Sequence, residues 1–129
     1  MTVPDELTSL CPLSELPDPG ARAFSWGEGA WPLECFIVRQ GDKAFAYVNC
    51  CPHAGHELNW QPDRFLTSEG DLILCQSHGA RFTISDGLCV LGPCPGAKLT
   101  GLSLMERDGE LFASVAELDA LLAARGGTP

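Results

Sequence analysis

Basic side chains are scarce in this sequence of 129 residues. Lys and Arg number 8 against 17 Asp and Glu, which gives a formal net charge of −9 at pH 7. Binding to a nucleic-acid backbone requires clusters of Lys and Arg, so the composition argues against a nucleic-acid partner. The acidic excess suits protein partners that present a positively charged surface.

Long hydrophobic runs are missing as well. No uninterrupted apolar stretch exceeds about five residues, whereas a membrane-spanning helix needs about 20, so we expect no membrane span. Residues 1–13 have neither a basic start nor an apolar central segment, so we expect no secretory signal and a cytoplasmic protein. The hydrophobic fraction of 45% is typical of a globular chain, and the length fits a single domain, residues 1–129.

Histidine is also rare, with three residues at positions 53, 56 and 78, and each lies close in sequence to Cys51 or Cys75. The chain has seven cysteines, and an odd number argues against a secreted disulfide scaffold. In a reducing cytosol, cysteines and histidines that cluster in the sequence are typical of metal sites. This clustering is the most informative feature of the sequence.

Turn residues divide the chain into short segments rich in β-forming residues. Strands are expected at residues 33–40, 43–49, 71–75, 80–85, 99–107 and 110–113. The dipeptides Gly41-Asp42 and Asp108-Gly109 are typical of hairpin turns. Many short strands of this kind predict an all-β fold, a sandwich or small barrel of antiparallel strands. Residues 1–20, rich in Pro and acidic residues, are expected to form a surface coil with short extended pieces.

The end of the chain has a different pattern. Ser114 and Glu117 fit a capping box, in which Ser114 is the N-cap. Leu118, Leu121 and Leu122 then follow at helical spacing, and glycines end the run. A short C-terminal α-helix is therefore predicted over residues 115–125, with its leucines packed on the core.

Two Cys/His pairs are the candidate metal ligands. Cys51 and His53 form a C-x-H pair, and Cys75 and His78 form a C-x-x-H pair. Two Cys and two His can hold either one tetrahedral zinc ion or one [2Fe–2S] cluster, and the spacing alone leaves both open. The mixed composition of each pair favours a two-iron site, because common zinc sites pair Cys with Cys and His with His along the chain.

The residues around these pairs resemble the cluster-binding loops of Rieske iron–sulfur proteins. The segment NCCPHAGHEL at residues 49–58 resembles the first loop, and CQSHGARF at residues 75–82 resembles the second. The segment GPCPG at residues 92–96 resembles the Pro-rich loop that covers the cluster. The resemblance implies a Rieske-like β fold with a cluster-binding loop subdomain and one [2Fe–2S] cluster per chain. Residues 62–70, between the two ligand loops, are expected to form a surface excursion.

The same resemblance implies that Cys51 and Cys75 bind one iron, and that His53 and His78 bind the other. High-potential relatives also place hydroxyl side chains where this chain has Ala80 and Phe82. Hydrogen bonds to sulfur stabilise the reduced cluster, so their absence lowers the potential. We expect a midpoint near the low end of the Rieske range, on the order of −150 mV.

The remaining cysteines are given structural roles. Cys11 and Cys35 are expected to pack as small hydrophobic residues, and Cys50 is expected to point into the core. Cys89 and Cys94 are close enough in sequence to form a disulfide under oxidation, although thiols are expected.

The ligand set also limits the function. Once His53 and His78 are assigned to the cluster, only His56 is left, and a mononuclear iron site with two histidines and one carboxylate cannot form. No G-x-G-x-x-G pattern indicates a bound dinucleotide. We therefore expect the protein to have no catalytic activity of its own. The resemblance implies a small Rieske-type ferredoxin, a one-electron carrier between a reductase and an oxygenase or related oxidoreductase.

Two other functions stay open from the sequence. One is a small iron–sulfur subunit of a nitrite reductase or dioxygenase complex, in which the cluster serves one fixed partner. The other is a zinc-stabilised interaction module, since the same four side chains could hold zinc. The sequence does not indicate an oligomeric state.

Overall fold

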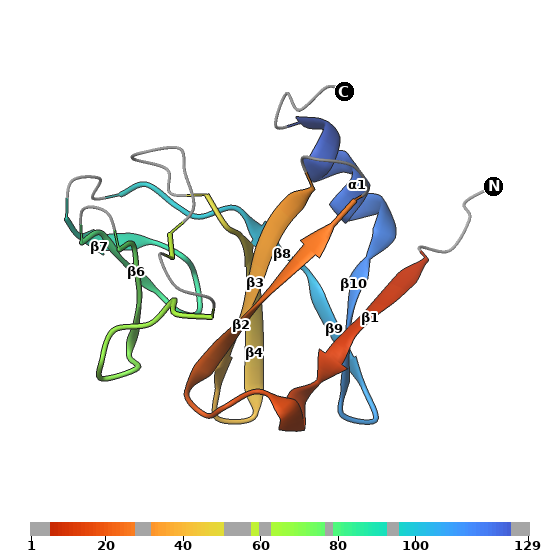
Figure 1. Cartoon of the computed structure of the whole chain (residues 1–129), viewed down its shortest axis with the longest axis horizontal. Helices are drawn as coiled ribbons and strands as arrows, with labels where there is room; N and C mark the ends of the chain where they lie inside the picture. Colours follow the sequence, from red (N-terminus) through yellow and green to blue (C-terminus); the bar gives the residue numbers. More distant parts are fainter. Residues whose placement is uncertain are drawn as a thin grey trace.

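The computed structural model describes residues 6–27, 32–50, 58–59, 63–76, 79–92 and 96–124. Within these residues, ten short strands form three antiparallel sheets, accompanied by a 3-10 helix (η1) and a C-terminal α-helix (α1). In Figure 1 one sheet lies in the middle of the molecule, the second lies beside it with α1, and the third lies on the opposite side. The all-β fold with one short C-terminal helix is confirmed.

The central sheet is buried on both faces. Cys35 and Ile37 in its second strand face one core, while Phe36 and Val38 face the other, and none of the four is more than 1% exposed. Successive side chains of a strand point to opposite faces, so a strand buried on both sides needs a continuous apolar run. The strands, in the order β2-β3-β4-β8, are β2 (Gly20–Trp26), β3 (Leu33–Gln40), β4 (Lys43–Val48) and β8 (Gly101–Leu102).

The second sheet and the helix cover one face of the central sheet (Figure 1). Leu111 and Leu118 anchor this core, each no more than 2% exposed. We call these two sheets with η1 and α1 the basal lobe. The second sheet, in the order β1-β10-β9, and its helices are β1 (Leu7–Pro12), β10 (Glu110–Ser114), β9 (Leu104–Arg107), η1 (Leu13–Glu15) and α1 (Val115–Ala124).

The third sheet packs on the other face of the central sheet through a separate core. We call the described residues from Leu58 to Leu99 the ligand lobe. Phe65 from this lobe stacks on Phe36 with ring centroids 4.3 Å apart and an angle of 8° between the rings. The strands of its sheet, in the order β5-β6-β7, are β5 (Leu72–Leu74), β6 (Arg81–Thr83) and β7 (Cys89–Leu91).

Most of the expected elements are confirmed. The hairpin of β3 and β4 forms around Gly41, and that of β9 and β10 turns at Asp108 and Gly109, both with positive φ, as a tight hairpin turn requires. In the capping box, the backbone N–H of Glu117 donates to Oγ of Ser114 at 3.2 Å. The Glu117 carboxylate accepts from the backbone N–H of Ser103 at 2.9 Å and so ties the helix to the link between β8 and β9.

Three expectations were correct only in part. Residues 1–20, predicted as a surface coil with short extended pieces, contain the six-residue strand β1, whose backbone pairs with β10 along Leu7–Pro12. The predicted surface excursion at residues 62–70 sends Phe65 into the core, where it is 0% exposed. The single strand expected over residues 99–107 is divided at Ser103 into β8 and β9, which belong to different sheets.

The cysteines follow the expectations in part. Cys11 and Cys35 are buried among apolar side chains, as expected. Cys50 is exposed, so its assignment to the core was wrong. The chain turns at this position, where the backbone N–H of Cys50 donates to the carbonyl of Val48 at 2.9 Å, so the alternation of β4 does not continue. In the described part of the chain, no helix has the length and hydrophobicity to span a bilayer.

Candidate metal centre

Of the four candidate ligands, Cys75 lies in the described part of the chain. Cys51, His53 and His78 lie outside the described residues. Cys75 directly follows strand β5, and its side chain is 0% exposed. Its position at the end of a strand, at the start of a turn, is the one expected for a ligand carried on a loop.

The second ligand loop is closed at its base by the backbone. The N–H of Cys75 donates to the carbonyl of Ala80 at 2.8 Å, and the N–H of Gly79 donates to the carbonyl of Cys75 at 3.0 Å. Gly79 has a φ of +75°, in the left-handed region that favours glycine. The chain therefore reverses within a few residues of Cys75 and enters β6.

The covering loop expected at residues 92–96 begins against this turn. A Cβ atom added to Gly92 would lie 2.7 Å from Cα of Ala80, so the backbone approach requires glycine at position 92. At the base of the loop, the N–H of Cys89 donates to the carbonyl of Ala97 at 2.8 Å, and the N–H of Gly96 donates to the carbonyl of Cys89 at 3.1 Å. Residues 93–95 lie outside the described part.

The two ends of the first ligand loop also meet. Asn49 follows β4, and its Oδ1 accepts a hydrogen bond from the backbone N–H of Leu58 at 2.8 Å. The carbonyl of Leu58 in turn accepts from the N–H of Gln76, next to Cys75, at 2.8 Å. The flanks of the segment that carries Cys51 and His53 are thus brought beside the second ligand loop. Asn49 was not predicted as part of the site, because no local pattern distinguishes it from an ordinary loop asparagine.

The two positions at which high-potential relatives have hydroxyl side chains are apolar and buried in this protein. Ala80 and Phe82 are both 0% exposed, and neither carries a hydroxyl group. The thiol of Cys89 donates to the carbonyl of Leu91 at 3.2 Å. Since Cys94 lies outside the described residues, the proposed alternative of a disulfide between Cys89 and Cys94 is not tested.

The two lobes are also joined by a buried tyrosine. The hydroxyl of Tyr47 on β4 donates to the carbonyl of Ile84 in the ligand lobe at 2.5 Å. Burial, together with the nearby charge of Asp86, raises the pKa of Tyr47 to about 12. The neutral hydroxyl is therefore the form that this junction stabilises.

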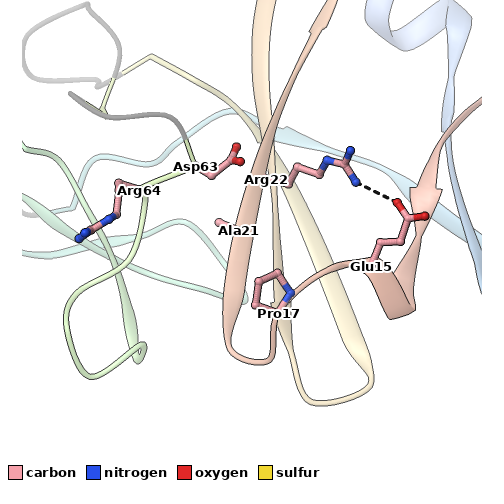
Figure 2. A pocket seen from close by; sticks show the side chains of 6 residues that line it. All are labelled: Glu15, Pro17, Ala21, Arg22, Asp63 and Arg64. Atoms are coloured by element: carbon pink, nitrogen blue, oxygen red, sulfur yellow. Dashed lines mark hydrogen bonds and ion pairs between the residues drawn. The ribbon is translucent and has the colours of Figure 1, made fainter.

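A second junction lies at the surface, in an open groove of about 500 Å³ (Figure 2). Oδ1 of Asp63 accepts from the backbone N–H of Ala23 on β2 at 2.7 Å, which fixes the start of the ligand lobe on the central sheet. Figure 2 shows Arg22 directed toward Glu15, with which it pairs at 3.1 Å, and Arg64 directed away from both. The groove therefore has a structural role at the junction.

The described residues fit an iron–sulfur centre. A buried thiol, that of Cys75, lies in a turn that Gly79 permits and that Gly92 covers. Two thiols and two imidazoles are the donor set of a mixed-ligand [2Fe–2S] cluster. Residues 6–115 match the family model of the Rieske [2Fe-2S] domain. The chain belongs to this family. The Rieske domain holds one [2Fe–2S] cluster, which agrees with the expected cofactor.

Among characterised proteins, this Rieske chain is similar to "Ferredoxin CarAc" of Metapseudomonas resinovorans. The two are 29% identical over 86 residues, which cover 67% of this chain and 73% of that ferredoxin. The similarity thus covers most of both proteins.

Solved structures show the same fold. The ferredoxin of carbazole 1,9a-dioxygenase from Nocardioides aromaticivorans IC177 is 23% identical, with a TM-score of 0.65 over 84% of this chain and 96% of that one. A chain in the complex of reduced oxygenase and oxidised ferredoxin of carbazole 1,9a-dioxygenase is 21% identical, with a TM-score of 0.65 over 84% and 92%. A chain in the reduced complex of the two proteins has a TM-score of 0.70 at 16% identity, and there the match covers 86% of this chain but 28% of that chain. The same Rieske fold is thus found in chains of very different length.

Proposed function

We propose that this chain is a ferredoxin that carries one electron at a time to an oxygenase or a related oxidoreductase. The match of residues 6–115 to the Rieske [2Fe-2S] domain is the observation that carries the proposal. The 29% identity to a ferredoxin over 73% of its length supports a carrier over a zinc-stabilised module or a fixed subunit of a nitrite reductase or dioxygenase complex.

The ligand assignment is part of the proposal. Cys51 and Cys75 would bind one iron, and His53 and His78 the other. When bound, the cluster would supply one-electron storage between its diferric and mixed-valence states. The chain's own residues would bury the thiolate of Cys75 and surround it with the apolar side chains of Ala80 and Phe82. A reducing cytosol would keep the cysteine ligands available for the metal, which is why we propose a cytoplasmic carrier.

The redox partners would dock beside the covering loop. Val90 and Leu91 are the exposed large hydrophobic residues of the described chain, with 44% and 52% of their surfaces exposed. Both lie at the end of β7, directly before Gly92, which contacts the second ligand loop. A partner with a small apolar contact surface would cover these two residues and reach the metal centre at the same time. The partners would be a reductase as donor and an oxygenase as acceptor, as the oxygenase–ferredoxin complexes of similar fold suggest.

The composition of the purified protein tests this function. Material purified without oxygen should contain about two iron atoms and two sulfide ions per chain and absorb visible light. A colourless protein with one zinc ion and no inorganic sulfide would contradict the proposal. Stoichiometric copurification with a larger subunit would instead support a fixed subunit of an oxidoreductase complex.

A further inference from the structure

The loops around the metal centre are closed at their bases in two different ways. The second ligand loop is closed by backbone hydrogen bonds of Cys75 with Ala80 and Gly79, and the covering loop by backbone hydrogen bonds of Cys89 with Ala97 and Gly96. The flanks of the first ligand loop are instead joined by a side chain, through the bond from the N–H of Leu58 to Oδ1 of Asn49. Substitutions leave backbone groups in place, but they can remove a side-chain bond. Among the contacts of the described residues, the side-chain bond of Asn49 is therefore one that a single substitution can remove.

The Asn49 carboxamide is held in a defined orientation. Its Nδ2 donates to Oδ1 of Asn59 at 2.9 Å, which directs its own Oδ1 toward Leu58. The backbone N–H of Asn49 donates to the carbonyl of Glu34 on β3 at 2.8 Å. Asn49 is 7% exposed and Leu58 is 0% exposed. The side chain is therefore anchored on the central sheet and largely removed from water.

A hydrogen bond continues from this side chain to the second ligand loop. The carbonyl of Leu58 accepts from the N–H of Gln76, the residue that follows Cys75. The peptide groups on either side of Leu58 thus bond to Asn49 in one direction and to the second loop in the other. Movement of Leu58 would change the position of the first loop relative to Cys75.

We propose that Asn49 is a positioning residue for the metal centre, which holds the first ligand loop in register with the second through Leu58. This inference rests on the proposed function, because it assumes that both loops bind one cluster. Loss of the Asn49 acceptor would leave the buried N–H of Leu58 without its partner, and a buried unsatisfied donor is costly. Leu58 would move to relieve that cost, and the flank of the first ligand loop would lose its register with the second ligand loop.

The test compares Asn49→Leu with the matched control Thr67→Val in the cluster-loaded protein. Thr67 lies in the ligand lobe, is 8% exposed, and donates from Oγ1 to Oδ1 of Asp71 at 2.6 Å, so the control also removes a buried polar bond. We expect Asn49→Leu to release its cluster to an excess of iron chelator about tenfold faster than the wild type. We also expect a broadened EPR signal in its reduced state. Thr67→Val should keep the wild-type release rate and EPR line shape, even where it lowers the unfolding temperature.

A second pair of variants covers the case in which Asn49→Leu does not fold. Asn49→Asp keeps an acceptor oxygen at the same distance along the side chain, whereas Asn49→Ser is too short to reach Leu58. The proposal predicts release several-fold faster from Asn49→Ser than from Asn49→Asp. Equal release rates in this pair, or wild-type release and line shape in a folded Asn49→Leu protein, would overturn the role of Asn49. Wild-type protein that holds zinc in place of iron and sulfide would overturn the proposed function as well, so the two failures are distinguishable.

Discussion

The basal lobe and the ligand lobe reach their structures by different means. In the basal lobe, β2 and β3 pair along seven consecutive positions, and the long ladders distribute stability over many backbone bonds. In the ligand lobe, each of the three strands has three residues, and the loop bases are held by a few hydrogen bonds and by close approaches at glycine. The metal-binding region is therefore a set of short segments positioned by a regular sheet, and substitution of a single residue there should have a large effect.

The ligand lobe contacts the basal lobe through the central sheet. Substitutions at these contacts can therefore test whether the two lobes are coupled. Phe36 and Tyr47 on the central sheet contact Phe65 and Ile84 of the ligand lobe, and Asp63 bonds to the edge strand β2. Changes at these contacts should affect the ligand lobe more than the basal lobe. Changes deep in the basal core should lower overall stability without altering the properties of the metal centre.

The largest contrast is expected between two fully buried cysteines, one in each lobe. Cys75→Ala should abolish cluster binding, because a thiolate ligand is lost, while Cys35→Ala in the basal core should retain full iron and sulfide. Iron and sulfide analysis of both variants, with far-UV circular dichroism to check folding, measures the difference. Full iron and sulfide in a folded Cys75→Ala protein would contradict the ligand assignment.

The stacked phenylalanines at the junction should give the next largest effect. Phe65→Ala removes a ring that is 0% exposed, and it should lower the free energy of unfolding by about 3–5 kcal/mol and speed cluster loss. Leu118→Ala in the basal core should cost about 2–5 kcal/mol but leave the reduction potential unchanged. Denaturant unfolding and redox titration of both variants separate the two effects. A shift of the potential in Leu118→Ala would show that the lobes are not independent in this respect.

The Tyr47–Ile84 bond should make the junction sensitive to alkaline pH. The pKa of Tyr47 is raised in the folded state to about 12, above its ordinary value near 10, so the folded state favours the neutral hydroxyl. The contribution of this raised pKa to the free energy of unfolding is therefore fully present below pH 10. It should be lost as the pH rises through 12, which lowers the free energy of unfolding by up to about 3 kcal/mol. Urea unfolding at several pH values between 9 and 12 measures this loss. In Tyr47→Phe the decline in this window should disappear, and an unchanged decline would assign it to other groups.

A smaller change, in the reduction midpoint, is expected when a hydroxyl group is added to the apolar core that contains Cys75. Ala80→Ser introduces a hydroxyl donor at a fully buried position, and it should raise the midpoint from a wild-type value on the order of −150 mV. A rise on the order of 50 mV corresponds to about a tenfold change in a one-electron equilibrium. Redox titration followed by visible absorption measures both values. A wild-type midpoint well above zero would refute the argument from Ala80 and Phe82.

The smallest effect is expected at the exposed edge of the ligand lobe. Leu91→Ser removes apolar surface from the proposed docking site, and it should slow electron transfer to an oxygenase by roughly threefold through weaker binding. The reduction potential should stay at the wild-type value, because Leu91 is 52% exposed and lies beyond the ligand loops. Stopped-flow reoxidation at several partner concentrations measures the change. Unaltered kinetics would place the docking surface elsewhere.

The regular part of the fold was largely predictable from sequence. The hairpin of β3 and β4 follows from an apolar run, a Gly-Asp turn and a second apolar run, all of which are local signals. Strand β1 was missed because its residues have no strong pattern of their own and are held in a strand by pairing with β10, about 100 positions later. Strand β2 was also missed, because its apolar and polar residues do not alternate: Ala23 and Phe24 are adjacent and pack against different cores.

The sequence indicated the family and a set of candidate ligands, but it did not indicate the residues that position the ligand loops. The two Cys/His pairs and their flanks indicated the family because metal ligands and close turns require particular residue types at fixed spacing. The roles of Asn49 and Phe65 depend on contacts with Leu58 and Phe36 that form only when distant segments pack together. No local pattern distinguishes such residues from a loop asparagine or a surface aromatic, so the structure was needed to find them.

The central claim is that two loops, each with one cysteine and one histidine, bind one [2Fe–2S] cluster. Pulsed EPR of the dithionite-reduced protein, prepared with ordinary or with nitrogen-15-labelled histidine, tests it most directly. We expect magnetic coupling to two imidazole nitrogens, both of whose signals change with the label, and loss of one of these couplings in any cluster that His78→Ala retains. A reduced protein with no EPR signal, or a signal without coupling to histidine nitrogen, would contradict it.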